Sequence, residues 1–405
     1  MTTFTRHADR LDVVAAAEAA GVDRATVLDT IDRLDAAVAT IDGNGFDPTP
    51  FGPQSRLTDA IGLGEAELWV KDETNNVSGS HKGRHLFGVA LSMALAGETP
   101  ERLAIASCGN AAFAASVIAS AIKQPLDVFV PDWAGDEVVD RIAANGASVV
   151  RVRRDPDRPG DPAHHAMVDA VANGATAFSC QGTNTPMTVD GGRTMAYEML
   201  DTLGEHRLHR LFLQVGGGAL GSAVVSGLQR VLGDDDLPVI HAVQPEGNYP
   251  LVAAWNTIIE ELLGEEPKGN YGRSKAAAEL GRMPADARRA ALAGATAEPG
   301  RYMKPWATEP QSYATGILDD VTYDWLPIVD AMLASGGYPV VAADSDFRIA
   351  HMLAHAHTDM PVCPTGASGL GGILAVQRDV RPDFTGERVA VVFSGQQRPG
   401  DPRPL

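Results

Sequence analysis

Short apolar runs alternate with helical stretches along most of this chain, and few folds accommodate that pattern. From about residue 67 onward, runs rich in Val, Leu and Ile are separated by segments of helical periodicity. Such alternation gives open parallel sheets with right-handed crossovers, and continuous apolar runs are typical of strands covered on both faces. The sequence therefore predicts an α/β fold with strands near 67–71, 102–106, 126–130, 147–153, 210–215, 239–244, 339–343 and 388–393.

The first 45 residues predict a helical extension. Asp23 is a candidate helix cap and Gly43 a candidate stop. We expect this extension to pack on the body of the protein or on a partner subunit. A helix-turn-helix with Gly21 at its turn is disfavoured by the acidic charge of the chain. Between cap and stop, apolar residues recur at the i, i+3/i+4 spacing of a helix: Val27, Ile31, Leu34, Val38 and Ile41.

The charge and hydropathy of the chain exclude several classes of partner. A formal net charge of −19 and a pI near 4.9 disfavour binding to nucleic acid or to anionic membranes. We interpret the acidity as a device for solubility or as an adaptation to a salty cytoplasm. The sequence has no N-terminal signal-peptide pattern and no apolar run of about 18 residues, so we expect neither secretion nor a membrane span. These features predict a cytoplasmic protein.

Cysteine and histidine patterns predict neither a disulfide framework nor a metal site. The three cysteines are odd in number and widely spaced, which indicates a reducing compartment. His351 and His355 share a helix face at i, i+4, but no third ligand converges on them. Such a pair is more typical of a protein surface than of a metal centre.

Lys82 stands out among the six lysines of the chain. It lies in Ser78-Gly79-Ser80-His81-Lys82-Gly83-Arg84, between an apolar strand and the helix expected from about residue 83 to 96. Helix starts disfavour cations, and the flanking Gly and Ser residues permit close approach. A lysine amine can form a Schiff base with an aldehyde, which arginine cannot do. Lys82 is therefore a candidate catalytic residue.

Three further segments supply what an aldehyde cofactor bearing a phosphate needs. Ser107-Cys108-Gly109-Asn110 follows a strand and opens a helix, where backbone N–H groups bind anions such as carboxylate. Residues 215–221 (Val-Gly-Gly-Gly-Ala-Leu-Gly) also join a strand to a helix, and successive glycines let the backbone form a nest around a phosphate. Residues 389–395 form a buried strand that ends in the hydroxyl of Ser394.

Together these segments resemble those of the fold-type-II pyridoxal-phosphate enzymes, the superfamily of threonine synthase, serine/threonine dehydratase, cysteine synthase and the tryptophan synthase β-subunit. Their order matches as well. Pro48-Thr49-Pro50 comes first, followed by the lysine segment, the Asn110 segment, the glycine loop and the strand ending at Ser394. The resemblance covers roughly residues 46–398, and four motifs in the family order are far more specific than any single one.

The resemblance implies pyridoxal 5′-phosphate as cofactor and assigns candidate site residues. Lys82 resembles the Schiff-base lysine, Asn110 the partner of the cofactor 3′-oxygen, and Ser394 the hydroxyl that faces the pyridine nitrogen. The implied cofactor-binding set is Lys82, Asn110, Gly216, Gly217, Gly218, Ala219, Leu220 and Ser394, and the implied substrate-binding set is Ser107, Cys108, Gly109, Thr315 and Thr365. No metal ligand is expected.

The resemblance also implies an architecture of two open, mainly parallel twisted sheets covered by helices. We expect an N-terminal helical extension at 1–45, a large cofactor-binding domain from 46–83 and 196–405, and a small mobile domain at 84–195. The expected oligomeric state is a homodimer, and the expected substrate is a small amino acid.

A neutral hydroxyl at the ring nitrogen suits prompt loss of a β- or γ-substituent better than transamination. The first hypothesis is therefore a lyase that performs β-elimination or β/γ-replacement on serine, threonine or an activated homologue through a Lys82 Schiff base. Two departures from the family keep alternatives open. Cys108 replaces a hydroxyl that acts opposite the lysine in racemases, so an amino-acid racemase with Cys108 as second acid/base is one alternative. Cys363-Pro364 replaces a glutamate-proline, which weakens a close analogy to any one dehydratase or synthase. The other alternative is a non-catalytic cofactor-binding regulator, and the intact Lys82, Asn110 and glycine loop argue against it.

Overall fold

The structure is a computed structural model that describes residues 1–404 except 133, 155–157, 159, 160, 282 and 284. Contacts between Cα atoms divide the chain into two compact units. The first comprises residues 1–49 and 75–194, and the second comprises residues 50–74 and 195–405. That residues 84–195 move as a small domain stays a prediction.

The first unit contains a parallel four-stranded sheet in the order β5-β4-β3-β6. Helix α6 packs against α5 and α7, and α8 packs on β3, β4 and β5. A side chain at Gly88 of α5 would meet the backbone of Gly191 in α9 (Met187–Leu203) at 2.8 Å. Helices α5 and α9 therefore approach too closely at this point for any residue other than glycine. Its elements are α1 (Thr3–Arg6), η1 (Ala8–Arg10), α2 (Asp12–Ala19), α3 (Arg24–Asp42), η2 (Val77–Gly79), α5 (Lys82–Ala96), β3 (Leu103–Ala106), α6 (Asn110–Ala121), β4 (Leu126–Pro131), α7 (Asp136–Ala144), β5 (Ser148–Val152), α8 (Pro162–Ala172), β6 (Thr176–Ala177) and the start of α9 (Met187–Leu203).

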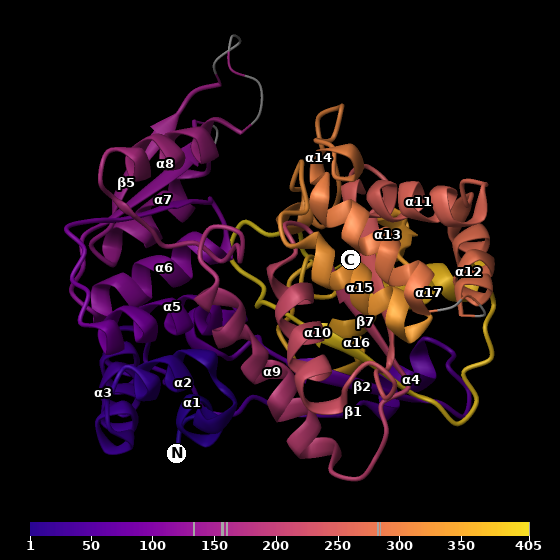
Figure 1. Cartoon of the computed structure of the whole chain (residues 1–405), viewed down its shortest axis with the longest axis horizontal. Helices are drawn as coiled ribbons and strands as arrows, with labels where there is room; N and C mark the ends of the chain where they lie inside the picture. The colour runs from indigo at the N-terminus through magenta and orange to yellow at the C-terminus, as the bar shows by residue number, and fades with distance from the viewer. Residues whose placement is uncertain (133, 155–157, 159–160, 282, 284, 405) are drawn as a thin grey trace. The chain divides into compact units, whose positions relative to one another are not determined.

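The N-terminal helices pack on the body of this unit, one of the two arrangements expected for them. In Figure 1 the indigo helices α1, α2 and α3 lie beside α5, and α3 contacts both α5 and α6. Phe4, Phe46 and Phe87 form one aromatic cluster with ring centroids 4.4–5.2 Å apart. The predicted signals of α3 are confirmed: the Asp23 side chain accepts a hydrogen bond from Thr26 N, and Gly43 ends the helix at φ +92°.

The second unit contains a six-stranded sheet in the order β1-β2-β10-β7-β8-β9. All neighbours are parallel except β1, which pairs antiparallel with β2 at the edge. Its elements are β1 (Phe51–Pro53), α4 (Ser55–Ala60), β2 (Glu67–Asp72), the rest of α9, β7 (Arg210–Gln214), α10 (Ala219–Leu232), β8 (Val239–Pro245), α11 (Pro250–Leu263), α12 (Gly269–Leu280), α13 (Ala285–Ala297), α14 (Pro299–Tyr302), η3 (Thr315–Ile317), α15 (Trp325–Ser335), β9 (Val340–Ala342), α16 (Asp344–His357), α17 (Ser368–Asp379) and β10 (Arg388–Phe393).

The predicted α/β class with two mainly parallel sheets is confirmed, and each of the eight expected strands is present within two residues of its expected ends. Two strands were not predicted, β1 and β6, because neither contains an apolar run long enough to stand out.

Within the described part of the chain, no helix is long and apolar enough to cross a bilayer. The central strands β7 and β10 are almost fully buried, so the loops that follow them are held on a rigid base.

Candidate active site

The burial of the six lysines, all of which lie in the described part of the chain, separates Lys82 from the rest. Lys71 is fully buried and forms an ion pair with Glu198. The other four are exposed: Lys123, Lys268, Lys275 and Lys304. Lys82 is half-buried at the first position of α5, and no described residue forms a hydrogen bond or ion pair with its Nζ. It is therefore the lysine whose amine is both sheltered and available.

The turn before Lys82 is held by side-chain contacts to its backbone. Ser78 adopts φ +60°, and its N–H donates to Asp42 Oδ1 at 2.9 Å. The Asn76 side chain accepts from Val77 N at 2.8 Å. Ser80 Oγ is buried and has no hydrogen-bond partner among the described residues. A buried hydroxyl is normally satisfied, so Ser80 fits a site that takes a polar ligand.

Two buried histidines flank Lys82 and form a chain with a defined proton order. His85 Nδ1 lies 3.0 Å from Thr188 O, and His85 Nε2 lies 3.1 Å from His81 Nδ1. Because a carbonyl only accepts, His85 Nδ1 donates, and in the neutral ring its Nε2 accepts from His81 Nδ1. His81 Nε2 therefore carries a lone pair. Burial, aided by the charge of Lys82, lowers the pKa of His81 well below its usual value and that of His85 to about 3.

The hydrogen-bonded pair of His81 and His85 makes the stability of the first unit depend on pH. The pKa of His85 is 6.5 in an ordinary environment and about 3 in the fold, so the unfolded chain binds more protons as pH falls below 6.5. The stabilisation from neutral His85 is complete above that pH and is lost toward pH 3. Between neutral pH and about pH 5, we expect the unfolding free energy of His85→Gln to fall by about 2 kcal/mol less than that of the wild type. Urea titrations at several pH values measure this difference.

His206→Gln, at an exposed histidine, is the matched control and is expected to follow the wild type. A wild-type pH dependence shared by His85→Gln would show that the histidine chain is not buried in its neutral form.

The Asn110 segment forms the start of a twelve-residue helix in the first unit. Helix α6 begins at Asn110, and Gly109 N donates to Ser107 Oγ at 3.2 Å. Ser107, Cys108 and Asn110 are partly exposed. The N–H groups at a helix start can hold a carboxylate, and the Asn110 amide can donate to a ring oxygen.

The glycine loop in the second unit presents a row of N–H groups without protein acceptors. It links β7 to α10, and Gly218 caps that helix at φ +98°, a conformation that other residues rarely adopt. No described residue accepts a hydrogen bond from the N–H of Gly216, Gly217 or Gly218. A side chain at Gly216 would meet Ile317 Cα at 2.8 Å, and Asp324 N donates to Gly217 O at 3.0 Å. The loop is therefore fixed from behind and suited to an oxyanion such as phosphate.

Ser394 follows β10 at the same carboxyl edge of the sheet. It is 5% exposed, and Gln214 Nε2 lies 2.7 Å from its Oγ. Gln214 is the last residue of β7, the strand that pairs directly with β10. Sequence reasoning did not select Gln214, although a polar residue that closes an apolar strand was a usable signal.

Thr315 and Thr365 belong to two loops that the structure brings together. Gly316 N donates to Thr365 Oγ1 at 2.9 Å, and Cys363 N donates to Gly395 O at 2.9 Å. The Thr365 turn therefore bridges the Thr315 loop and the Ser394 turn. Thr315 is exposed and Thr365 half-buried, so both hydroxyls are accessible to a ligand.

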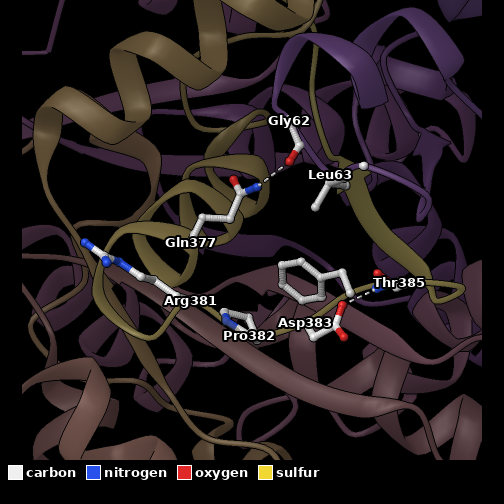
Figure 2. Close-up of a pocket in the computed structure, with 9 residues that line it drawn as sticks. Gly62, Leu63, Gln377, Arg381, Pro382, Asp383 and Thr385 are labelled. Carbon is white, nitrogen blue, oxygen red and sulfur yellow. Dashed lines mark hydrogen bonds between the residues drawn. The ribbon is translucent and has the colours of Figure 1, made fainter.

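A hollow of about 300 Å³ lies before the amino-terminal ends of β2 and β10, and Figure 2 draws the residues that line it. Gln377 Nε2 donates a hydrogen bond to Gly62 O at 3.4 Å across this hollow. Asp383 Oδ1 accepts a hydrogen bond from Thr385 N at 2.9 Å. The segment 381–385 precedes β10, whereas the glycine loop and Ser394 follow the carboxyl ends of their strands. Parallel sheets bind ligands at the carboxyl ends, so we do not assign the reaction to this hollow.

No group of three or more His, Cys, Asp or Glu side chains among the described residues is placed to hold a metal ion. His351, which we expected at the surface, is fully buried instead. Its Nε2 lies 3.0 Å from Val362 O and from Gln397 Oε1, and its Nδ1 lies 2.9 Å from Tyr313 OH. These partners come from distant segments, which is why the sequence did not reveal them.

Comparison with known proteins identifies the family. A family model described as pyridoxal-phosphate dependent enzyme matches residues 44–273. The chain belongs to this family. A threonine synthase of Methanocaldococcus jannaschii is 24% identical over 340 residues, which cover 82% of this chain and 71% of the relative. An L-serine dehydratase of Saccharomyces cerevisiae is 28% identical over 198 residues, covering 45% of this chain and 58% of the relative.

Solved structures of other proteins share the fold of this chain. The processed form of threonine deaminase isoform 2 from Solanum lycopersicum superposes with a TM-score of 0.65 at 15% sequence identity, covering 93% of this chain and 91% of the deaminase. This similarity confirms the predicted fold type. The family is that of enzymes with pyridoxal 5′-phosphate as cofactor, which confirms the cofactor inferred from the resemblance.

The residues present fit this cofactor on observations made in each unit separately. The first unit offers the sheltered amine of Lys82 and the unsatisfied hydroxyl of Ser80. The second offers the free N–H groups of the glycine loop and the hydroxyl of Ser394. An aldehyde, a phosphate and a ring nitrogen are the groups that such donors and amines recognise.

Proposed function

We propose that this protein is a pyridoxal-phosphate-dependent lyase that performs β-elimination or β/γ-replacement on a small amino acid such as serine, threonine or an activated homologue. The observation that carries the proposal is Ser394. Among the described residues its Oγ has one hydrogen-bond partner, the neutral amide of Gln214. A neutral environment at the ring nitrogen favours loss of a leaving group over transamination. The threonine synthase and L-serine dehydratase relatives agree with that reaction class.

When bound, pyridoxal phosphate withdraws electrons from the α-carbon of an amino acid attached to it. Lys82 is the proposed point of covalent attachment through its Nζ. The same amine, when it is not attached to the cofactor, would be the base for the α-proton. The N–H groups of Gly216, Gly217 and Gly218 and the start of α10 would hold the phosphate, and the Asn110 amide would donate to the 3′-oxygen.

The substrate contacts follow from the same donors. We propose that the N–H groups at the start of α6, with Ser107, Cys108 and Gly109, bind the substrate carboxylate. Thr315 and Thr365 would face the substrate side chain. For L-serine, the Cα–H and Cβ–O bonds break and one water leaves. Hydrolysis of the released product returns that water and gives pyruvate and ammonia, whereas a replacement reaction adds a second nucleophile at Cβ or Cγ.

The finer points of assembly and location are also proposals. We propose a homodimer in the cytoplasm. Cys108, Cys180 and Cys363 all lie in the described part of the chain and none forms a disulfide, which agrees with a reducing compartment.

Cys108 separates the lyase from the alternative of a racemase. Racemisation needs a second acid/base opposite Lys82, whereas elimination needs only the lysine and an assisted leaving group. We therefore expect Cys108→Ala to retain ammonia and keto-acid release from L-serine or L-threonine within about tenfold of the wild type, or about 1.4 kcal/mol. Coupled assays for ammonia and keto acid measure this, and chiral chromatography of the remaining amino acid measures racemisation.

Cys108→Ser is the matched variant, because it restores a hydroxyl of nearly the same size. Rapid formation of D-serine by the wild type, abolished in Cys108→Ala and kept in Cys108→Ser, would replace the lyase with the racemase. Cofactor bound at Lys82 with no turnover of any small amino acid would favour the regulatory alternative.

A further inference from the structure

Gln214 is held in one orientation by three oxygen atoms. Its Nε2 lies 2.7 Å from Ser394 Oγ, 3.0 Å from Val392 O and 3.1 Å from Gly366 O. Two of these are carbonyl oxygens, which only accept hydrogen bonds, so the atom that faces them is the amide nitrogen. The amide nitrogen carries two hydrogens for these three acceptors, so at least two of the acceptors share one hydrogen. The amide oxygen is buried and has no partner among the described residues, which costs about 1–3 kcal/mol.

This orientation of the amide determines whether Ser394 Oγ donates or accepts in its hydrogen bond with Gln214. The Gln214 nitrogen has no lone pair to offer, so Ser394 Oγ accepts from it and keeps its own proton for another acceptor. Among the described residues no acceptor takes that proton. A buried hydroxyl with an unplaced proton fits a ligand that offers a lone pair.

The thiol on the turn beside the pair is neutral. Cys363 lies on the adjoining turn, where its Sγ accepts from Gly366 N at 3.2 Å. Burial raises the pKa of this thiol to about 11, so it stays neutral. Among the described residues, the hydrogen bond that makes Ser394 Oγ an acceptor therefore comes from the neutral amide of Gln214.

We propose that Gln214 is a positioning residue that makes Ser394 a hydrogen-bond donor to the cofactor's ring nitrogen and so keeps that nitrogen unprotonated. This inference rests on the proposed function and extends it to a residue that does not itself touch the cofactor. Without the Gln214 donor, the Ser394 hydroxyl is free to rotate and to turn its proton away from the ring. Its lone pairs then face the ring and favour a protonated nitrogen.

The test uses the holoenzyme loaded with cofactor labelled with ¹⁵N in the ring, and follows the nitrogen chemical shift against pH. In Gln214→Met, which removes the donor at similar volume, we expect the protonation midpoint of the ring nitrogen to rise by at least about one pH unit, a tenfold gain in proton affinity. The yield of transamination product relative to ammonia should rise as well. Gln214→Glu, which keeps a polar group of the same size, is expected to shift the midpoint in the same direction if Gln214→Met fails to fold.

Gln244→Met is the matched control. Gln244 is a buried glutamine near the end of the neighbouring strand β8, where its Nε2 donates to Val215 O at 3.1 Å. Among the described residues it forms no hydrogen bond with Ser394. We expect this variant to lose stability without moving the nitrogen midpoint. In a Ser394→Ala background, Gln214→Met should add no further shift, because it acts through Ser394.

A nitrogen midpoint that Gln214→Met leaves unchanged, in an enzyme that still releases ammonia, would overturn this inference and leave the proposed function intact. Equal shifts in Gln214→Met and Gln244→Met would overturn it too, since they would show a general effect of packing. Failure of the wild type to attach cofactor through Lys82 would instead overturn the proposed function.

Discussion

Lys82→Ala is expected to lower the release of ammonia and keto acid by at least about a thousandfold, because it removes both the covalent attachment and the general base. The fold should survive, since the side chain is half-buried and no described residue is bonded to its Nζ. Steady-state assays at saturating cofactor, together with a thermal melt, measure both effects.

Two variants make this result specific. Lys82→Arg keeps the positive charge but not the nucleophilic amine, so we expect it to be as inactive as Lys82→Ala. Lys123→Ala removes an exposed lysine of the same unit and should behave as the wild type. Substantial activity in Lys82→Arg would show that only the charge matters and would contradict the assignment.

Lys71→Met is expected to destabilise the second unit by about 3–5 kcal/mol, because it leaves buried carboxylates without their cation. Lys71 Nζ is fully buried, forms an ion pair with Glu198 and lies 3.8 Å from Glu73 Oε1. Urea denaturation followed by tryptophan fluorescence measures the loss. This burial also argues against Lys71 as the lysine that reacts with the cofactor.

A double-mutant cycle tests whether the pair carries the effect. Adding Glu198→Gln to Lys71→Met should cost less than the sum of the single changes, with a coupling of at least about 1 kcal/mol. The exposed pair Arg289–Asp286 is the control, and Asp286→Asn should change stability by less than about 1 kcal/mol. Additive losses in the cycle would rule out a buried ion pair.

The fold was predictable where the sequence carries local signals. The cap at Asp23 and the stop at Gly43 bound α3 because both act through the backbone of neighbouring residues. The eight longer strands were visible as apolar runs. The short strands β1 and β6 depend on pairing with β2 and β3, and that pairing is not encoded in three or two residues of sequence.

The site was predictable where its chemistry lies in one segment, and not where it depends on contacts between segments. Lys82 and the glycine loop can be selected as candidates from residue type and spacing in the sequence. The Gln214–Ser394 hydrogen bond joins residues 180 positions apart, and only the adjacency of β7 and β10 brings them together. The role of His85 depends likewise on Thr188, although its i, i+4 spacing from His81 was a local hint.

Borohydride reduction of the holoenzyme, followed by proteolysis and mass spectrometry, tests the central claim most directly. Reduction converts the lysine–cofactor bond into a stable secondary amine and so marks the reacting residue. We expect the label on the peptide that contains Lys82, and on that residue within it. Label on Lys71, Lys123 or another lysine, or no label on a protein that has bound the cofactor, would contradict the account.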